Sequence, residues 1–471
     1  MDDIPAEIFS RIFEIGVHQW GIGFLPPLCL TCRQWYSVIE TTPRLWGILV
    51  LRKKMNFETF HAQMRKAKAS PLSVTVMPNA TRCYPHSALS NLATSWVYAN
   101  IPLSVLKQTN WNDLSALETL VLRGDGELVP DPEIVDSFFQ NDTSRPKSAL
   151  RSLSVKDVPF PWIRGMLSSY ISHFQMTGRT QGIHPYWMVV RERPCNRISE
   201  TFGCLSLIPN VAILSLANLN HCRCHPYSGS LVHLDQLTVL ELNKVSNFSA
   251  ILSKIRAPAL QSLSITSSPS DELRTSYYYS YYNTYTSDND TSDNDSAIKI
   301  PFSTVFAEWS HSGSLPSQLT DLELNHCLTR AELPYLIRWL RRLPRLSRFT
   351  IGLDSTVLDG GLTEDCDIFR ALSVPYRLNN DTEGQGSEAW LCPALVQLCV
   401  EAQEVRVADL LAIAQARNVP STTRDLQQTP GKLRCIYAAI CYNGSEKEVE
   451  ELRNLVEEMA CRCFGCQLTM A

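Results

Sequence analysis

The sequence lacks the long hydrophobic run that a membrane-spanning helix requires, because no segment approaches roughly 20 uninterrupted apolar residues. Its first residues, MDDIPAEIFS, are acidic where a secretory signal would be basic. It also lacks an excess of positive charge, since 43 lysines and arginines stand against 47 aspartates and glutamates. A protein without an excess of positive charge is poorly suited to bind nucleic acid. We therefore expect an intracellular protein, in the cytoplasm, the nucleus or both, with no nucleic-acid or membrane partner.

Recognisable catalytic motifs are missing as well. The sequence has no G-x-S-x-G, no phosphate-binding loop, no H-E-x-x-H and no paired carboxylates in a recognisable frame. We therefore expect a chain that is not an enzyme and carries no cofactor.

The 16 cysteines do not form a convincing metal site. The run CRCFGC, with Cys461, Cys463 and Cys466, has no histidine near it, whereas zinc sites usually pair two such halves or add histidines at fixed spacing. In HCRCH, residues 221–225, five consecutive residues cannot all reach one tetrahedral centre. We expect no metal, and metal analysis of the purified protein would test the alternative of a metal-binding regulator.

What the sequence does contain, at its start, is more apolar surface than a small helical unit can bury. In residues 4–46, Ile8, Ile12 and Ile15 recur at i, i+4 and i+7, with Phe9 and Phe13 beside them. A second apolar cluster follows, with Pro43 and Trp46 closing the unit: Leu25, Leu28, Leu30, Cys32, Trp35, Val38 and Ile39. So small a unit buries only about 60% of the surface of its unfolded chain. The excess predicts an interface.

The rest of the chain repeats the pattern apolar-x-x-apolar-x-apolar. Nine copies begin at Leu117, Leu150, Val211, Leu237, Leu260, Leu319, Leu346, Leu395 and Leu433. The last two apolar positions of each copy are two apart and so share one face of a strand. The shortest intervals between copies, 23, 26 and 27 residues, match the roughly 20 to 29 residues of leucine-rich repeats. The pattern predicts an α/β solenoid, or horseshoe, whose strands have one buried face.

The spacing of the copies also predicts interruptions. The intervals of 61 and 59 residues span about two repeats each, with one copy degenerate or displaced by an insertion, and WMVV at 187–190 is a candidate degenerate copy. The polar, tyrosine-rich stretch near 273–298 reads as a disordered insertion. At the end, Ser445 and Glu448 predict a capping box that opens a terminal amphipathic helix, with Val456 and Met459 on its apolar stripe.

The N-terminal stretch resembles an F-box, whose usual pattern is Leu-Pro-x-Glu-Ile/Leu, x-x-Ile, Cys-Arg-x-Trp and then Leu-Trp. The matching positions are Ile4, Pro5, Glu7, Ile8, Ile12, Cys32, Arg33, Trp35, Leu45 and Trp46, with Ile4 in place of the usual leucine. The segment is similar to the form found in large fungal F-box families, which often continue into irregular leucine-rich repeats. The resemblance covers about one tenth of the chain by motif and the rest by architecture only.

The resemblance implies a fold and a function. It implies a three-helix F-box at 1–50, an irregular leucine-rich-repeat solenoid at 51–444, and a capping helix and tail at 445–471. It also implies a Skp-type adaptor bound by the F-box, a cullin-RING ubiquitin ligase reached through that adaptor, and an unknown target protein bound by the repeats. The adaptor-binding residues would be Ile4, Pro5, Glu7, Ile8, Ile12, Leu28, Cys32 and Trp35. The alternative is an interaction scaffold without a ligase role, whose N-terminal helices only seal the end of the solenoid.

One basic run stands out against the acidic average of the chain. It consists of Arg338, Arg341, Arg342, Arg345 and Arg348. Such a run is usually a solvated helix face, but guanidinium groups also bind acidic or phosphorylated segments. We keep it as a possible target-binding patch.

Overall fold

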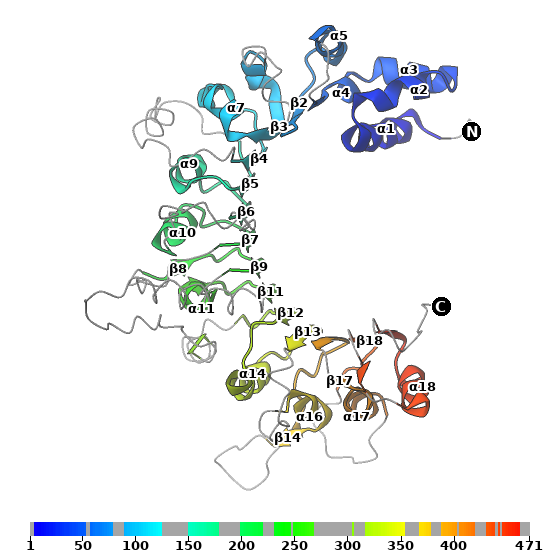
Figure 1. Cartoon of the computed structure of the whole chain (residues 1–471), viewed down its shortest axis with the longest axis vertical. Coiled ribbons are helices and arrows are strands. Elements are labelled where there is room, and N and C mark those ends of the chain that lie inside the picture. Colours follow the sequence, from blue (N-terminus) through cyan, green and yellow to red (C-terminus); the bar gives the residue numbers. More distant parts are fainter. Residues whose placement is uncertain are drawn as a thin grey trace, which may run out of the picture. The chain divides into compact units, whose positions relative to one another are not determined.

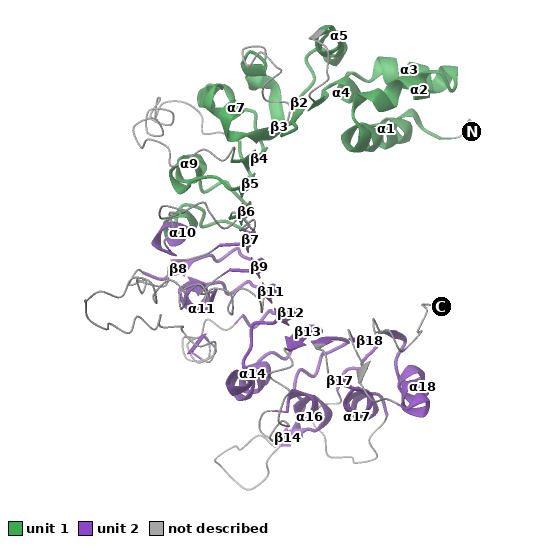
Figure 2. Cartoon of the chain, in the orientation of Figure 1, with its two compact units in different colours: residues 1–185, 203–211 green, residues 186–202, 212–471 purple. Residues whose placement is uncertain are grey.

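The computed structural model describes residues 4–52, 57–78, 89–124, 149–178, 198–219, 230–245, 248–267, 304–305, 316–353, 367–377, 388–402, 405–419, 430–438, 441–442 and 445–461 (Figure 1). The chain divides into two compact units, which are residues 1–185 with 203–211 and residues 186–202 with 212–471 (Figure 2). The predicted insertion near 273–298, the WMVV segment, the HCRCH cluster and the tail from 462 onward all lie outside the described residues.

Unit 1 begins with a cluster of short helices. They are α1 (Ala6–Trp20), the 3-10 turn η1 (Ile22–Phe24), α2 (Leu25–Cys29), α3 (Arg33–Thr41) and α4 (Pro43–Trp46). Helices α2 and α4 each have proline in the first turn, where the missing N–H group costs no helical hydrogen bond. Their apolar residues meet in one core, formed by Phe9, Phe13, Val17, Leu25, Val38, Ile39, Leu45 and Ile48.

The remainder of unit 1 is a sheet of parallel strands with helices on one side (Figure 1). The strands, in spatial order, are β1 (Ile48–Leu51), β2 (Leu72–Val76), β3 (Trp96–Pro102), β4 (Thr119–Arg123), β5 (Ser152–Lys156) and β6 (His173–Thr177). The connecting helices are α5 (Phe57–Ala67), α7 (Leu103–Lys107) and α9 (Phe160–Met166), with 3-10 turns η2 (Ala93–Ser95) and η3 (Trp111–Asp113). Helix α10 (Ile198–Leu205) has residues assigned to both units.

Unit 2 has the same architecture. Its parallel strands, in spatial order, are β7 (Ile213–Ala217), β9 (Val239–Asn243), β11 (Ser262–Thr266), β12 (Asp321–Asn325), β13 (Arg348–Leu353), β16 (Gln397–Ala402), β18 (Cys435–Ala438) and β20 (Glu458–Cys461). Its helices are α11 (Phe248–Ser253), η4 (Arg330–Glu332), α14 (Leu333–Leu340), α16 (Ile368–Ser373), α17 (Val407–Asn418) and α18 (Glu446–Leu455). Three small pairs complete it: β8 (Val232–His233) with β10 (Ile255–Arg256), β14 (Tyr376–Arg377) with β15 (Glu388–Ala389), and β17 (Val405–Arg406) with β19 (Cys441–Tyr442).

The register of the strands explains why the apolar pattern repeats. Neighbouring strands of unit 2 align their buried positions in rows, and one row runs through Leu240, Leu263, Leu322, Phe349, Leu398 and Ile436. Each of these side chains is 2% exposed or less. Alternate residues on the same strands face solvent, because side chains along a strand alternate between its two faces. Each strand therefore buries one face against the helices and leaves the other face open.

A left-handed residue follows several strands directly. Asp157, Asn218, Lys244 and His326 have φ between 51° and 57°, and each amide donates to the last carbonyl of the next strand or the residue beside it, at 2.6–3.1 Å. The chain thus leaves each of these strands in a turn and still makes one more backbone hydrogen bond to the next strand. Gly124, the residue after β4, packs against the backbone of the turn at Asp157. A Cβ atom at position 124 would lie 2.0 Å from the carbonyl oxygen of Asp157.

Most of the predicted elements are confirmed, and one of the two long intervals contains a strand that was not predicted. All nine predicted copies contain a strand of the main sheet. The 61-residue interval hides a copy that the sequence reading missed, the strand β6, in which Phe174 and Met176 replace the usual aliphatic residues. In the 59-residue interval, β11 pairs directly with β12, so this interval is an insertion and not a degenerate copy.

The predicted terminal helix is shorter than expected. The capping box of Ser445 and Glu448 is present, but α18 ends at Leu455 and the chain becomes extended at Val456. Met459, predicted on the helical stripe, lies in strand β20, which pairs with β18. The residues Val456, Met459 and Cys461 have the repeat spacing themselves, so the strand pattern prevailed over the helical one. No helix in the described part of the chain is both long and apolar enough to cross a membrane.

Candidate docking surface on the N-terminal helices

Helix α1 is bounded at both ends by backbone geometry. Pro5 precedes it in an extended conformation, and Glu7 in the first turn places a negative charge near the positive end of the helix dipole. At the other end Gly21 has φ 78°, and its amide donates to the carbonyl of Val17 at 2.8 Å. With ψ at 179°, this is a backbone conformation that almost only glycine adopts. The chain can therefore turn sharply after Trp20.

One face of α1 is fixed in the core of the unit. Phe9 and Phe13 are 4% and 2% exposed, and the ring of Trp35 from α3 lies 5.7 Å and 5.4 Å from theirs. Gly16 lies on the same face because a Cβ atom at that position would be 2.0 Å from the ring of Phe24. These aromatic contacts fix the rotational orientation of α1 about its own axis. The orientation of its other faces is set as a result.

A second face of α1 is apolar and exposed. Ile8, Ile12 and Ile15 are 51%, 50% and 50% exposed, and Ile4, two residues before the start of α1, is 39% exposed. The spacing of Ile8, Ile12 and Ile15 places them along one side of the helix, and Ile4 lies in the segment that leads into it. We call this set, Ile4, Ile8, Ile12 and Ile15, the isoleucine face. Its members are apolar side chains that remain 39–51% exposed to solvent. A contiguous exposed apolar surface is typical of an interaction site.

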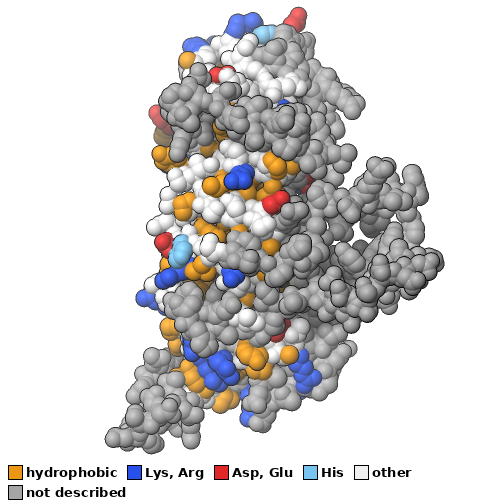
Figure 3. Space-filling view, turned by 90° about the vertical axis from the view of Figure 1, so that its left-hand side faces the viewer, with side chains coloured by type: hydrophobic (Ala, Val, Ile, Leu, Met, Phe, Trp, Pro, Cys, Tyr) orange, Lys and Arg blue, Asp and Glu red, His pale blue; other side chains and the backbone are white. Residues whose placement is uncertain are grey.

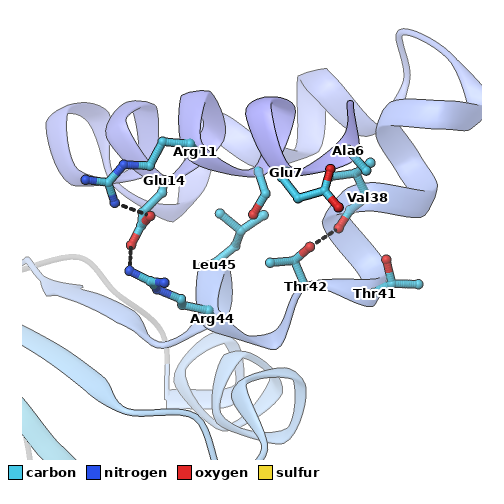
Figure 4. A pocket seen from close by; sticks show the side chains of 10 residues that line it. Ala6, Glu7, Arg11, Glu14, Val38, Thr41, Thr42, Arg44 and Leu45 are labelled. Atoms are coloured by element: carbon cyan, nitrogen blue, oxygen red, sulfur yellow. Dashed lines mark hydrogen bonds and ion pairs between the residues drawn. The ribbon is translucent and has the colours of Figure 1, made fainter. Parts of the chain in front are cut away.

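A third face of α1 forms a polar groove with α3 and α4 (Figure 4). The groove has a volume of about 390 Å³. Glu14 lies at its edge between two guanidinium groups, at 2.6 Å from Arg11 and 3.0 Å from Arg44. The carboxylate of Glu14 is therefore neutralised in place. Glu7 lies at the other end of the groove near Thr42, whose hydroxyl donates to a backbone carbonyl of α3 (Figure 4).

The helical cluster is joined to the first strands by buried polar contacts. Gln63 of α5 is 2% exposed, and its amide nitrogen donates to the carbonyls of Trp46 and Ile48 at 3.0 Å and 2.9 Å. Lys66 of the same helix lies 4.0 Å from the centre of the Trp46 ring and pairs with Glu40 of α3 at 2.5 Å. The helices, α5 and β1 therefore form one structure inside unit 1.

The predicted adaptor-binding residues fall into three groups. Ile4, Ile8 and Ile12 lie on the isoleucine face, whereas Leu28 and Trp35 are partly buried against the core and support it. The other three predicted residues lie at helix starts or in the groove: Pro5 precedes α1, Glu7 lines the groove and Cys32 precedes α3.

Several exposed apolar residues were missed among the predicted site residues. Ile15 continues the isoleucine face, and Leu30, Trp20 and Tyr36 are 88%, 59% and 53% exposed. Ile15 could have been found from its i+7 spacing to Ile8. Leu30 could not, because an apolar residue in a short helical unit is expected to be buried.

The predicted arginine patch is only partly available. Arg348 pairs with Asp321 on the neighbouring strand, and Arg345 donates to Gln318. Arg338 and Arg341 lie against the rings of Tyr335 and Tyr376. These four arginines therefore divide into two that are held by local polar partners and two that lie against aromatic rings.

The cysteines of the described residues are separate from one another. No group of three or more histidine, cysteine, aspartate or glutamate side chains in that part of the chain could hold a metal ion. Cys29, the last residue of α2, has a pKa raised by burial and also by the nearby Glu40 carboxylate, which Lys66 partly offsets. A raised pKa keeps this thiol protonated and unreactive at neutral pH.

No protein-family model matches the sequence, and no curated protein matches it. Among solved structures, the chain is similar to a protein from Bacteroides fragilis determined by a structural genomics consortium, with 13% sequence identity and a TM-score of 0.29. The alignment covers 74% of this chain, and the chain spans 66% of the length of that protein. A similarity of this degree assigns neither a family nor a function.

Proposed function

We propose that the chain is the substrate-recognition subunit of an SCF-type ubiquitin ligase. In this proposal residues 1–50 are an F-box, and the isoleucine face binds a Skp-type adaptor that connects the chain to a cullin-RING ligase. The sheet region is a leucine-rich-repeat-like solenoid that binds a target protein inside the cell, in the cytoplasm or the nucleus. The chain performs no chemistry of its own. It raises the local concentration of the target at the ligase.

The isoleucine face is the observation that carries this proposal. Its helix is anchored on the opposite side by Phe9, Phe13 and Trp35, so the face is presented in a fixed orientation. A preorganised apolar surface loses little conformational entropy when a partner covers it. It lies in the segment whose motif resembles an F-box.

The energy available from the face sets a requirement on the interface. Full burial of an isoleucine contributes about 1.5–3 kcal/mol, so covering the exposed half of four isoleucines gives roughly 3–6 kcal/mol. A micromolar complex requires about 8 kcal/mol, even before the costs of association. The partner must therefore also cover apolar residues outside the face, and Leu30, which follows α2 and is 88% exposed, is accessible for this.

The repeated architecture supports the solenoid part of the proposal. Parallel strands follow one another with rows of buried leucines in register, and each strand–helix segment buries its apolar face against its neighbours. This is the organisation of repeat proteins, whose open strand faces and loops commonly bind other proteins. The proposal places target recognition there.

A scaffold without a ligase role is the second candidate. The two hydrogen bonds from Gln63 and the stacking of Lys66 on Trp46 show that the helical cluster packs on the first strand. In a scaffold, the only role of the helical cluster would be to cover the first strand and stabilise that end of the sheet. Deleting residues 1–50 would then unfold the first strands, and the isoleucine face would have no partner.

Co-expression with a Skp-type adaptor, followed by size-exclusion chromatography, tests the proposal. The full chain should elute with the adaptor in a stoichiometric complex, and Ile8→Asp should abolish it, because an unpaired carboxylate in an apolar interface costs several kcal/mol. Val419→Asp is the matched control, since Val419 is also 51% exposed but lies at the end of α17.

The outcomes separate the candidates. Failure of the wild-type chain to form the complex, or a complex that Ile8→Asp leaves intact, contradicts the adaptor-binding role. Loss of the complex in both Ile8→Asp and Val419→Asp would show an effect of charge or folding and not of the isoleucine face. Circular dichroism of each variant confirms that it is folded.

A further inference from the structure

Helix α14 and the segment after it are strongly basic in an otherwise acidic chain. Residues 330–348 contain six arginines and a single acidic residue, Glu332. Glu332 is buried, and its carboxylate accepts hydrogen bonds from Thr329 in a capping box. It is therefore held at the start of the helix and does not lie among the arginines that follow.

Two of the arginines are exposed and lack an acidic partner in the described part of the chain. The guanidinium of Arg341 lies 4.6 Å from the ring centre of Tyr376, and that of Arg338 lies 5.9 Å from the ring centre of Tyr335. By contrast, Arg348 is paired with Asp321 and Arg345 with Gln318. Among the residues that the structure describes, these two positive charges therefore lie against aromatic rings and have no carboxylate paired with them.

The positions of these residues form one surface. Tyr335, Arg338 and Arg341 are spaced three residues apart, so they lie along one side of α14, and β14 brings Tyr376 against Arg341. Figure 3 shows arginine and lysine side chains beside hydrophobic ones in the lower part of the face it presents, at the height of α14 in Figure 1. We call the four residues Tyr335, Arg338, Arg341 and Tyr376 the tyrosine–arginine surface.

We propose that the tyrosine–arginine surface binds a phosphorylated segment of a partner protein, with Arg338 and Arg341 holding the phosphate group. A phosphomonoester carries about −1.5 to −2 charges at neutral pH, which matches the combined charge of two guanidinium groups. Side chains three residues apart on a helix have Cβ atoms about 5–6 Å apart, so both can reach one phosphate. Each guanidinium fork can bind two phosphate oxygens at once.

The tyrosines complete the binding surface. Tyr335 is 43% exposed, and its ring restricts the motion of Arg338, so less entropy is lost when the phosphate is bound. Arginine and tyrosine are also the residue types most enriched among the dominant contacts of protein interfaces. The rings offer an apolar contact to residues that flank the phosphate. This inference rests on the proposed function only in assigning the phosphorylated segment to a ligase target.

Fluorescence anisotropy with the full-length chain tests the proposal directly. The probes are labelled pools of synthetic peptides with randomised positions around a fixed phosphoserine, phosphothreonine or phosphotyrosine. Matched pools carry the unmodified residue or glutamate. The wild-type chain should bind at least one phosphorylated pool about tenfold more tightly than both matched pools. Inorganic phosphate should compete.

Charge-matched variants locate the site. R338Q/R341Q should weaken binding of the phosphorylated pool about tenfold or more, since both forks are lost. R338K/R341K should weaken it by a smaller factor, because lysine keeps the charge without the fork. R406Q/R453Q also removes two exposed arginines, each paired within its own helix region, and should bind as the wild type does.

Three outcomes would overturn the proposal: equal binding of phosphorylated and glutamate pools, unchanged binding by R338Q/R341Q, or equal weakening by R406Q/R453Q. None of them depends on the adaptor. Loss of adaptor binding with retained phosphopeptide binding would contradict the ligase role alone. Retained adaptor binding without phosphopeptide binding would contradict the phosphate site alone.

Discussion

Replacing Gln63 with leucine should loosen the helical cluster from the first strand of unit 1. The amide nitrogen of Gln63 donates to the carbonyls of Trp46 and Ile48, and the side chain is 2% exposed. Gln63→Leu keeps most of the volume but leaves both carbonyls without this donor. The two carbonyls lie on either side of Gly47, between the end of α4 and the start of β1. The two hydrogen bonds are therefore lost at the junction between the helical cluster and the first strand.

The size of the effect follows from the two lost bonds. A buried acceptor left without its partner costs about 1–3 kcal/mol. Part of this is offset, because the Gln63 side-chain oxygen has no partner among the described protein atoms and its removal relieves a buried polar group. We expect a net loss of about 2 kcal/mol. For a unit of 150–250 residues this lowers the melting temperature by roughly 4–8 °C.

Differential scanning calorimetry measures this loss, and hydrogen exchange of the β1 amides locates it. Gln34→Leu is the control, because Gln34 lies exposed on α3 and its replacement should change stability by less than about 0.5 kcal/mol. A Gln63→Leu protein as stable as the wild type, with unchanged exchange in β1, would refute the claim that these hydrogen bonds fix the junction. Adaptor binding below the melting transition should persist, since the isoleucine face is untouched.

Three further predictions concern single side chains. Gly16→Ala should destabilise unit 1 by about 1–3 kcal/mol in urea unfolding, because the new Cβ atom would lie 2.0 Å from the ring of Phe24. Arg417→Met should destabilise unit 2 by roughly 2–4 kcal/mol, because Arg417 is 4% exposed and donates to three backbone carbonyls. The hydrogen bonds from Ser445 hold the pKa of Glu448 below its usual value. Ser445→Ala should return that pKa toward normal in a carboxyl NMR titration.

Each of these predictions has a contradicting result. A Gly16→Ala protein more stable than the wild type would mean that helix propensity outweighs the contact with Phe24. An unchanged unfolding midpoint for Arg417→Met would mean that its carbonyl partners are satisfied without it. For Glu448 the depressed pKa implies that the cap strengthens α18 above the unfolded pKa of the carboxyl group. That contribution is lost as the pH falls through the folded pKa, and a pH-independent α18 would contradict it.

The repeat pattern predicted the strands well because each strand buries one face. Leucines at the second and third apolar positions have to enter the core, so their spacing alone indicates the element. The pattern failed where the core accepts other residues. In β6, Phe174 and Met176 fill the same buried positions, and at the end of the chain Met459 matched helical and strand spacing equally well.

The candidate sites were predictable only in part. The spacing of Ile8 and Ile12 indicated a helical stripe, and the excess of apolar residues indicated that part of it stays exposed. Trp35 was assigned to the same interface, but its packing on Phe9 and Phe13 is a tertiary contact that no local pattern shows.

Polar residues that act through distant partners were the hardest to interpret. Gln63 is a polar residue that its local sequence does not mark as a core position, yet it is buried and donates to two backbone carbonyls. Arg348 looked like one member of a basic run, and the strand register placed it beside Asp321. Both outcomes depend on which elements become neighbours in the fold.

Site-specific photo-crosslinking tests the central claim most directly, which is that the isoleucine face is the surface that a Skp-type adaptor covers. A photo-reactive phenylalanine derivative is introduced at position 12 or, in a matched protein, at position 11. Ile12 lies on the isoleucine face, and Arg11 lies on the groove side of the same helix. The account predicts a crosslink to the adaptor from position 12 and a much weaker one from position 11. No crosslink from position 12, or equal crosslinking from both positions, would contradict it.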